Sequence, residues 1–457
     1  MSRLVVVSNR VADLSKGSQS GGLAVALADA LSVSGGLWFG WDGNVVAKGT
    51  RVPPEIREEG PVTTATLPLT RKDHKEYYLG FSNSVLWPIF HYRLDLADFN
   101  ASHLKAYKRV NSKFADALVP LLKPDDRIWV QDYHLIPLAA ELRKRGIRQK
   151  IGFFLHIPFP PPSILAAAPD NEWLVRTLFS YDLVGFQTHA DVENLKDYVH
   201  DHHGIVSDGE QLRAYGRTTV AARFPIGIDV DTFAGLAHTA KADAQIETLQ
   251  RRTTARRHVI GVDRLDYSKG LPDRFRAFRR FLEDYPQYHK AVTLMQIAPP
   301  TREAVGAYSD IREQLESLTG AINGKFGDFD WTPLRYIHRN VPRDILAALL
   351  RGSPVGLVTP LRDGMNLVAK EYVAAQDVDD PGVLVLSKFA GAAEELTEAV
   401  IVNPYDIDEV SRALHTALTM PRDERRARNT ALLKRIRRHD AKTWQESFLA
   451  ALDGISV

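Results

Sequence analysis

Short apolar runs alternate with helical stretches along this chain, and the alternation limits its fold more than any other feature. Apolar runs that are bounded by turns and separated by helices predict buried parallel strands with crossover connections. The pattern occurs in two series. The first half carries four strand candidates, at residues 4–8, 127–130, 151–155 and 183–186. The second half carries six, at residues 258–262, 291–297, 334–337, 355–358, 382–386 and 399–402.

Two such series predict an α/β protein with two Rossmann-like, doubly wound parallel sheets. We expect a first domain at residues 1–235, a second at 236–440, and a C-terminal helix at 441–457 that crosses back to the first domain. Glycine and tryptophan in short alternating runs at residues 35–69 predict hairpins inserted into the first domain. Ligands bind at the carboxyl edges of such sheets, so the site is expected in a central cleft that both domains face.

Composition excludes several classes of function. A net charge of +2 over 457 residues gives no broad electrostatic footprint for nucleic acid, and the absence of cysteine excludes disulfides and thiolate metal sites. No apolar stretch approaches the roughly 20 residues that span a bilayer. The N-terminus is typical of a first strand rather than a signal peptide, so we expect a cytoplasmic protein with no membrane partner.

Residues 355–371 form a strand, a glycine-bearing turn and the start of a helix near Asn366. Such a turn aims the first N–H groups of a helix beyond the sheet edge, where they favour an anion. Asp363 and Glu371 add two carboxylates, so the stretch suits a sugar that bears a phosphate. The spacing alone is equally compatible with an ordinary strand–loop–helix unit.

A second strand-to-helix turn, at residues 261–270, carries two cations suited to a diphosphate, Arg264 and Lys269. The alternative is a surface turn with solvated charges. Neither a Walker A sequence nor a G-x-G-x-x-G fingerprint is present, which removes the main support for P-loop and dinucleotide-binding functions.

The first half places several polar groups after its strand candidates. They are Arg10, the Gly21–Gly22 pair at the start of the next helix, Asp132, His134 and His156. An aromatic patch at residues 77–92 includes Tyr78 and Trp87 and is typical of either core or sugar stacking. The histidines at 200, 202 and 203 lack the spacing of a metal site.

Eight motifs occur in the order of one known family. They are Ser-Asn-Arg at 8–10, Gly-Gly-Leu at 21–23, Gly-Leu-Trp-Phe-Gly-Trp at 36–41, and the stretches 81–88, 129–134, 152–160, 262–270 and 359–371. The chain resembles the bacterial trehalose-6-phosphate synthases, retaining glycosyltransferases of family 20 with the two-Rossmann GT-B fold. The resemblance covers residues 2–449.

The resemblance implies transfer of glucose from UDP-glucose, or another nucleoside diphosphate glucose, to glucose 6-phosphate, without a cofactor or metal. The implied acceptor residues are Arg10, Tyr78, Trp87, Asp132 and Arg302. The implied donor residues are Gly21, Gly22, His156, Arg264, Lys269, Val341, Asp363, Gly364, Met365, Asn366, Leu367, Val368 and Glu371. Within these sets, Arg264, Lys269, His156 and Asp132 are expected to act in catalysis.

The family's front-face mechanism lets the leaving phosphate take the acceptor's proton. A covalent intermediate would need a nucleophilic carboxylate and a second carboxyl as acid and base, and no motif offers an obvious pair. Arg264 and Lys269 would stabilise the charge on the diphosphate.

Other functions stay open at this stage. The alternatives are a pseudo-glycosyltransferase acting on cyclitols, a sugar-nucleotide epimerase, an inactive regulatory relative and a dinucleotide oxidoreductase. The short loop at residues 11–20 departs from the family pattern. The choice among UDP, GDP and ADP, and a dimeric or tetrameric state, are not legible in the sequence, although relatives often form homo-oligomers.

Overall fold

The computed structural model describes residues 2–13, 27–28, 31, 35–47, 53–203, 209–252, 256–301 and 306–455. The chain divides into two compact units. The first comprises residues 1–226 with 442–457, and the second comprises residues 227–441. The domain boundary expected at residue 235 lies inside helix α9 (Val230–Ala237), which belongs to the second unit.

The first unit is built on a nine-stranded sheet in the order β3-β4-β2-β1-β5-β6-β7-β9-β8. Its strands are β1 (Leu4–Arg10), β2 (Gly36–Val46), β3 (Glu55–Glu59), β4 (Val62–Thr70), β5 (Arg127–Gln131), β6 (Ile151–Phe154), β7 (Leu183–Phe186), β8 (Gln211–Ala214) and β9 (Arg217–Arg223). The central strands are parallel and buried along most of their length, apart from Arg10 at the end of β1 and Arg127 at the start of β5, which explains their apolar sequences.

Residues 35–69 differ from the predicted hairpins. Only β3 and β4 form an antiparallel hairpin, whereas β2 runs parallel to both β1 and β4 and extends the main sheet. The prediction was wrong for β2 because alternating residues reveal a half-buried strand but not the direction of its neighbour.

The helices of the first unit include one uncommon element, the 13-residue π-helix η1 (His74–Leu86). The others are α2 (Arg71–Asp73), α3 (Trp87–Phe90), α4 (Ala101–Leu118), α5 (Leu138–Lys144), α6 (Pro162–Leu165), α7 (Asn171–Leu178), α8 (His189–His203), α17 (Ala441–Gly454) and the 3₁₀ turns η2 (Leu94–Leu96), η3 (Val119–Leu121) and η4 (Tyr133–Leu135).

The C-terminal helix α17 packs on the sheet of the first unit. The Phe448 ring stacks on Trp129 of β5, with ring centroids 4.8 Å apart. A Cβ at Gly152 of β6 or at Gly185 of β7 would lie 2.7 Å from that ring, closer than real contacts allow. Glycine at these two strand positions therefore makes room for the helix.

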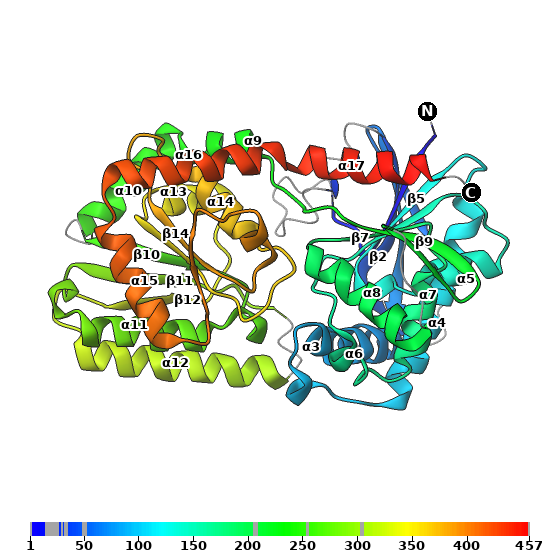
Figure 1. Ribbon diagram of the computed structural model, residues 1–457, viewed down its shortest axis with the longest axis horizontal. Coiled ribbons are helices and arrows are strands. Elements are labelled where there is room, and N and C mark those ends of the chain that lie inside the picture. The colour runs from blue at the N-terminus through cyan, green and yellow to red at the C-terminus, as the bar shows by residue number, and fades with distance from the viewer. Residues whose placement is uncertain are drawn as a thin grey trace. The chain divides into compact units, whose positions relative to one another are not determined.

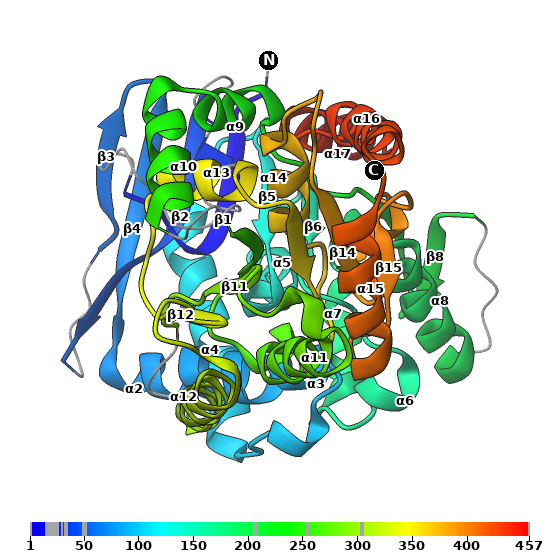
Figure 2. The same ribbon diagram turned by 90° about the vertical axis from the view of Figure 1, so that its left-hand side faces the viewer.

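The second unit is built on a six-stranded parallel sheet in the order β12-β11-β10-β13-β14-β15. Figure 2 labels β11 and β12 toward one edge of this sheet and β14 and β15 toward the other. Its strands are β10 (Arg257–Val262), β11 (Val292–Ile297), β12 (Leu334–Ile337), β13 (Val355–Val358), β14 (Val383–Ser387) and β15 (Val400–Val402). Counted from β10, the order is 3-2-1-4-5-6, that of a Rossmann sheet. All six predicted strands are confirmed to within one residue at each end.

Helices cover both faces of this second sheet (Figure 1). One face carries α9, α10 (Ala240–Arg252), α13 (Arg343–Arg351), α14 (Leu367–Ala375) and α16 (Arg422–Arg438). The other carries α11 (Leu271–Asp284), α12 (Gly306–Phe326) and α15 (Ile407–Thr419). The 3₁₀ turns are η5 (Tyr267–Lys269), η6 (Pro286–Tyr288) and η7 (Gly391–Glu394).

The core of the second unit lies between α11 and the sheet. Phe275, Phe278 and Phe281 of α11 are fully buried against strand residues such as Val259 and Leu294. Each such ring contributes about 1.5–3 kcal/mol of burial free energy. This packing holds the ends of β10 and β13, from which the candidate donor loops extend.

Candidate active site

In the first unit, three predicted site residues follow neighbouring parallel strands. Arg10 ends β1, Asp132 follows β5, and His156 follows β6. Asp132 adopts a φ of +74°, a conformation that few non-glycine residues adopt and that clusters at functional sites. Its Oδ1 accepts a hydrogen bond from the backbone N–H of His156 at 3.2 Å. The edge of this sheet therefore brings Asp132 and His156 together.

A series of aromatic contacts connects Arg10 to the other predicted acceptor residues. The Arg10 guanidinium carbon lies 5.9 Å from the Trp41 ring centroid, and Trp41 lies 5.4 Å from the ring of Tyr78. Tyr78 stacks on His134 at 5.8 Å, with the planes 14° apart. His134 contacts Tyr133, which lies 5.7 Å from Trp87.

The structure thus brings Arg10, Tyr78, Trp87 and Asp132 into one region of the first unit. The fifth predicted acceptor residue, Arg302, and the glycines Gly21 and Gly22 lie outside the described residues. Trp41 was missed as a candidate because it was read only as part of a family motif. The available signal was its position between Gly40 and Gly43, because an aromatic residue flanked by glycines is accessible to a ligand.

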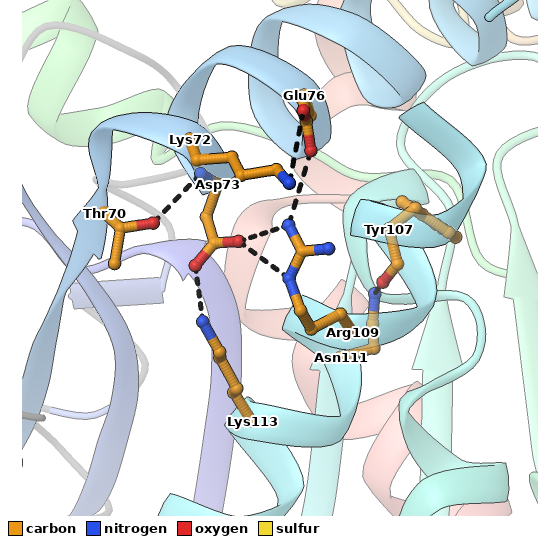
Figure 3. Close-up of polar contacts among 8 residues, drawn as sticks. All are labelled: Thr70, Lys72, Asp73, Glu76, Tyr107, Arg109, Asn111 and Lys113. Atoms are coloured by element: carbon orange, nitrogen blue, oxygen red, sulfur yellow. Dashed lines mark hydrogen bonds and ion pairs between the residues drawn. The ribbon is translucent and has the colours of Figure 1, made fainter. Parts of the chain in front are cut away.

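The π-helix that carries Tyr78 is held at its start by a buried carboxylate (Figure 3). Asp73 accepts hydrogen bonds from Arg109 at 2.7 Å and from Lys113 at 2.6 Å, both on α4. Thr70 caps the turn by accepting from the Asp73 N–H at 3.0 Å. Burial alone would raise the pKa of Asp73, but the hydrogen bonds from Lys113, Arg109 and Thr70 outweigh it and lower the pKa.

His156 is neutral over the physiological pH range, because burial lowers its pKa to about 3. Its Nε2 lies 2.8 Å from Oε1 of Gln131, a buried side chain at the end of β5. With the amide in this orientation, Gln131 accepts and His156 donates through Nε2. Nδ1 of His156 is then an acceptor suited to a sugar hydroxyl.

In the second unit, the two predicted donor loops extend from adjacent strands. Arg264 and Lys269 follow β10, and Asp363 follows β13, which pairs with β10. These two strands flank the switch point of the sheet, because β11 continues on the opposite side of β10. Ligands of open α/β sheets bind at that point.

An ion pair joins the two loops. Lys269 Nζ lies 2.6 Å from Asp363 Oδ2, and both side chains are largely buried. The backbone connects them as well, because the Leu361 N–H donates to the Ser268 carbonyl at 2.8 Å. Lys269 and Asp363 are 94 residues apart in sequence, so this ion pair connects two distant segments of the chain.

A buried arginine contacts the first residue of each of these two loops. Arg274 of α11 pairs with Asp263, directly after β10, and its Nε donates to Thr359 Oγ1 at 2.9 Å, directly after β13. Both charged side chains are almost fully buried. Burial raises the pKa of Asp263, while the charges of Arg274 and Lys269 oppose the rise. The sequence motifs gave no indication of this pair.

The loop from Asp363 to Asn366 is held on both sides. Its backbone bonds to residues 389–392 through the N–H and carbonyl of Asp363 and the carbonyl of Met365. Asn366, at a φ of +82°, accepts from the Ala369 N–H at 3.2 Å and donates to Asp363 at 3.0 Å. Asn366 therefore caps α14, whose first amides belong to Leu367 and Val368. Gly364 and Met365 are buried within the loop.

Glu371 lies one turn into α14 and is partly buried. Burial raises its pKa to about 7, and the charge of Arg343 at the start of α13 opposes the rise. Val341 lies in the turn that leads into α13 and is half-buried. The predicted ribose position thus lies on α14 and the predicted nucleobase position directly before α13, and these two helices contact each other.

Comparison with known proteins identifies the family. The family model described as Glycosyltransferase family 20 matches residues 4–454. The chain belongs to glycosyltransferase family 20. This finding confirms the resemblance predicted from the motifs.

Individual relatives are similar over nearly their whole length. The trehalose-6-phosphate synthase of Cronobacter sakazakii is 50% identical over 100% of this chain and 96% of that protein. A crystal structure of a UDP-forming alpha,alpha-trehalose-phosphate synthase from Burkholderia xenovorans in complex with glucose-6-phosphate matches with a TM-score of 0.96. That match is 50% identical and covers 99% of this chain and all of that one.

A structure from E. coli bound with UDP-2-fluoro glucose matches with a TM-score of 0.95 at 49% identity, covering all of both chains. With these neighbours, the two parallel-sheet units confirm the GT-B fold class predicted from the sequence. Among the described residues, no helix is both long and apolar enough to cross a bilayer.

Proposed function

We propose that this enzyme transfers glucose from UDP-glucose to glucose 6-phosphate, giving α,α-trehalose 6-phosphate and UDP. The observation that carries the proposal is the full-length similarity to a UDP-forming synthase solved with glucose-6-phosphate. The arrangement of predicted acceptor residues on the first unit and donor loops on the second supports it.

For the acceptor, we assign the phosphate to Arg10 and Arg302, since two guanidinium groups can neutralise a dianion. Tyr78 and Trp87 supply aromatic surface for the sugar ring, and Asp132 supplies a carboxylate for its hydroxyls. The contacts from Arg10 through Trp41 to Tyr78 support a common site for phosphate and sugar.

For the donor, we assign the diphosphate to Arg264, Lys269 and the first amides of α14, at Leu367 and Val368. The N-terminal amides of a helix lack partners within the helix and carry its positive end. Lys269 has three N–H donors, so it can bind a phosphate while it keeps Asp363.

The remaining donor contacts follow from chemistry and position. Asp363 and His156 accept from glucose hydroxyls, Glu371 accepts from the ribose, and Val341 lies against the base. Gly364, Met365 and Asn366 shape the loop. Gly21 and Gly22, which lie outside the described residues, are assigned to the donor because glycine permits close backbone approach to a ligand.

The reaction is proposed to occur on the front face of the sugar. The bond from the glucose anomeric carbon to the β-phosphate oxygen breaks, and a bond to the acceptor's anomeric oxygen forms. The acceptor's proton passes to the departing diphosphate. Arg264 and Lys269 stabilise the developing charge, a contribution that preorganised cations make without a metal.

The decisive experiment measures UDP release from UDP-glucose with and without glucose 6-phosphate. A synthase releases UDP only when the acceptor is present, and the product is α,α-trehalose 6-phosphate. An epimerase changes UDP-glucose without the acceptor, and an inactive relative changes nothing. A cyclitol-joining enzyme fails with glucose 6-phosphate but releases UDP with a cyclitol phosphate, so these three alternatives give distinct results.

We also propose a cytoplasmic, homo-oligomeric enzyme that uses UDP rather than GDP or ADP. Both proposed substrates are highly charged metabolites that do not cross membranes unaided. UDP preference rests on the UDP-forming relatives. A donor panel tests the nucleotide preference, and light scattering of the purified enzyme tests the homo-oligomeric state.

A further inference from the structure

The guanidinium of Arg10 lies directly over a glycine in β2. Gly43 adopts a φ of +92°, and a Cβ added there would lie 2.8 Å from Nη2, 3.0 Å from Nε and 3.1 Å from Cζ of Arg10. A Cβ at the first of these distances would force the guanidinium, the far end of a flexible and exposed side chain, to move. The missing side chain of Gly43 is therefore the space that the guanidinium occupies.

Gly43 lies in a bulge of β2, at an interruption in its pairing with β4. Between Trp41 and Val45, β2 advances four residues while its partner β4 advances only from Leu67 to Leu69. The residue between them on β4 is Pro68, which has no N–H to donate to the ladder. The pairing is interrupted there, and the extra residues of β2 leave the ladder.

The bulge is held by its own side chains. Asp42 accepts from the Asn44 N–H at 2.7 Å and from Asn44 Nδ2 at 3.0 Å. The indole N–H of Trp41 donates to the Asn44 carbonyl at 2.7 Å. The Trp41 ring, near the Arg10 guanidinium, is thus tied to the same turn as Gly43.

We propose that Gly43 is a positioning residue for the acceptor's phosphate. It leaves the space beside Trp41 in which the exposed Arg10 guanidinium lies, and a side chain at this position would restrict where the guanidinium can sit. A planar guanidinium binds phosphate best when two of its N–H groups face the oxygens together, and prior orientation reduces the entropy lost on binding. The inference rests on the proposed function, and it assigns Gly43 to selection of a phosphorylated acceptor.

The test compares Gly43→Ala with Gly60→Ala. Gly60 also has a positive φ, +63°, but a Cβ there would meet nothing within 4 Å, so it controls for backbone strain. We expect Gly43→Ala to raise KM for glucose 6-phosphate about tenfold, with kcat and the affinity for UDP little changed. Gly60→Ala is expected to leave all three constants unchanged.

A second comparison uses the Arg10→Ala background. If Gly43 acts through Arg10, Gly43→Ala adds no further rise in KM once the guanidinium is gone. Gly43→Asn is a second variant, because asparagine tolerates positive φ better than alanine and introduces the same Cβ. Thermal unfolding of each variant checks that it is folded.

Three results would overturn the inference: an unchanged KM in the Gly43 variants, an equal rise in Gly60→Ala, or a full additive effect in the Arg10→Ala background. Each of these results counts against the inference alone when the wild-type enzyme releases UDP on addition of glucose 6-phosphate. A wild type without that activity refutes the proposed function, and this role of Gly43 with it.

Discussion

At the scale of single residues, the candidate donor site depends on charged side chains that tertiary contacts hold in place. Lys269 is held by Asp363 at 2.6 Å, and Asp363 is held in turn by Asn366. This arrangement fixes the ammonium group before any ligand arrives. Such preorganised charge is worth most in the transition state, because no reorganisation is then needed.

Replacing either cation tests this role. Lys269→Ala or Arg264→Ala is expected to reduce kcat by about a hundredfold or more, because charge on the leaving diphosphate loses its partner. The thermal midpoint should fall far less. Arg279→Ala, which removes an exposed ion pair to Glu283 on α11, serves as the control with normal turnover. Wild-type turnover in either site variant would remove these residues from the mechanism.

The pKa of Glu371 leads to a prediction about pH. Because the folded-state value of about 7 exceeds the ordinary value of about 4.3, ionisation costs stability as pH rises through this range. Glu371→Gln should therefore unfold at a higher temperature than wild type at pH 8 and at a similar temperature near pH 4.

Although Glu371→Gln should stabilise the fold at pH 8, it should weaken donor binding. If the ionised carboxylate accepts from the ribose, wild-type affinity for UDP-glucose increases as pH rises from 6 to 8, and Glu371→Gln binds about tenfold more weakly without this pH dependence. Binding measured by calorimetry at each pH decides the point. Parallel pH profiles for the two proteins would contradict the ribose assignment.

At the scale of elements, the π-helix η1 is the least ordinary part of the fold. Its side chains follow the π spacing, since Asn83 and Ser84 donate to carbonyls five residues earlier, those of Tyr78 and Leu79. Asn83 also accepts from Tyr133 at 2.7 Å, so the element is tied to the residue after Asp132. Local propensity does not predict such an element when one of its contacts, the hydrogen bond from Tyr133, comes from a distant part of the chain.

Asp73→Asn tests the attachment of this element to α4. Loss of the charged bonds to Arg109 and Lys113 should cost about 1–2 kcal/mol at pH 7, a value reduced because both cations are partly exposed. KM for glucose 6-phosphate should also rise, because Tyr78 lies on η1.

The pKa of Asp73 supplies a control for this variant. The folded protein lowers this pKa, so the stabilisation is present above the ordinary value of about 3.9 and is lost as pH falls through the folded value. The difference between wild type and Asp73→Asn in urea unfolding should therefore shrink in acid. Asp95→Asn, at the exposed pair with Arg93, should show little change at any pH. A constant difference would point to packing rather than charge.

At the scale of the whole molecule, the last helix belongs to the unit that the chain builds first. Trp129, Gly152 and Gly185 form the surface on which Phe448 is buried. The first unit thus includes both ends of the chain. Its core therefore includes Phe448 of α17.

Phe448→Ala measures what this helix contributes. Removing a fully buried aromatic ring should cost about 3–5 kcal/mol, because the cavity between the glycines cannot fill. Lys442→Ala on the same helix is 75% exposed and is the matched control. Thermal unfolding followed by tryptophan fluorescence reports on the change directly. Equal midpoints for the two variants would show that α17 adds little to the first unit.

The sequence alone determined the class of fold and the positions of most strands. Buried parallel strands are continuous apolar runs, so residues 355–358 and 334–337 were legible to the residue. The long motifs also identified the family, and they supplied the candidate residues. These signals are local, and each can be read in one stretch of chain.

Tertiary structure alone decided which distant groups meet. The parallel direction of β2, the π-helix and the pair of Lys269 with Asp363 each depend on residues far apart in sequence. The space above Gly43 is of the same kind, because it exists only where Arg10 of another strand crosses it. Periodicity reports which side of an element is buried, but only packing determines what lies against it.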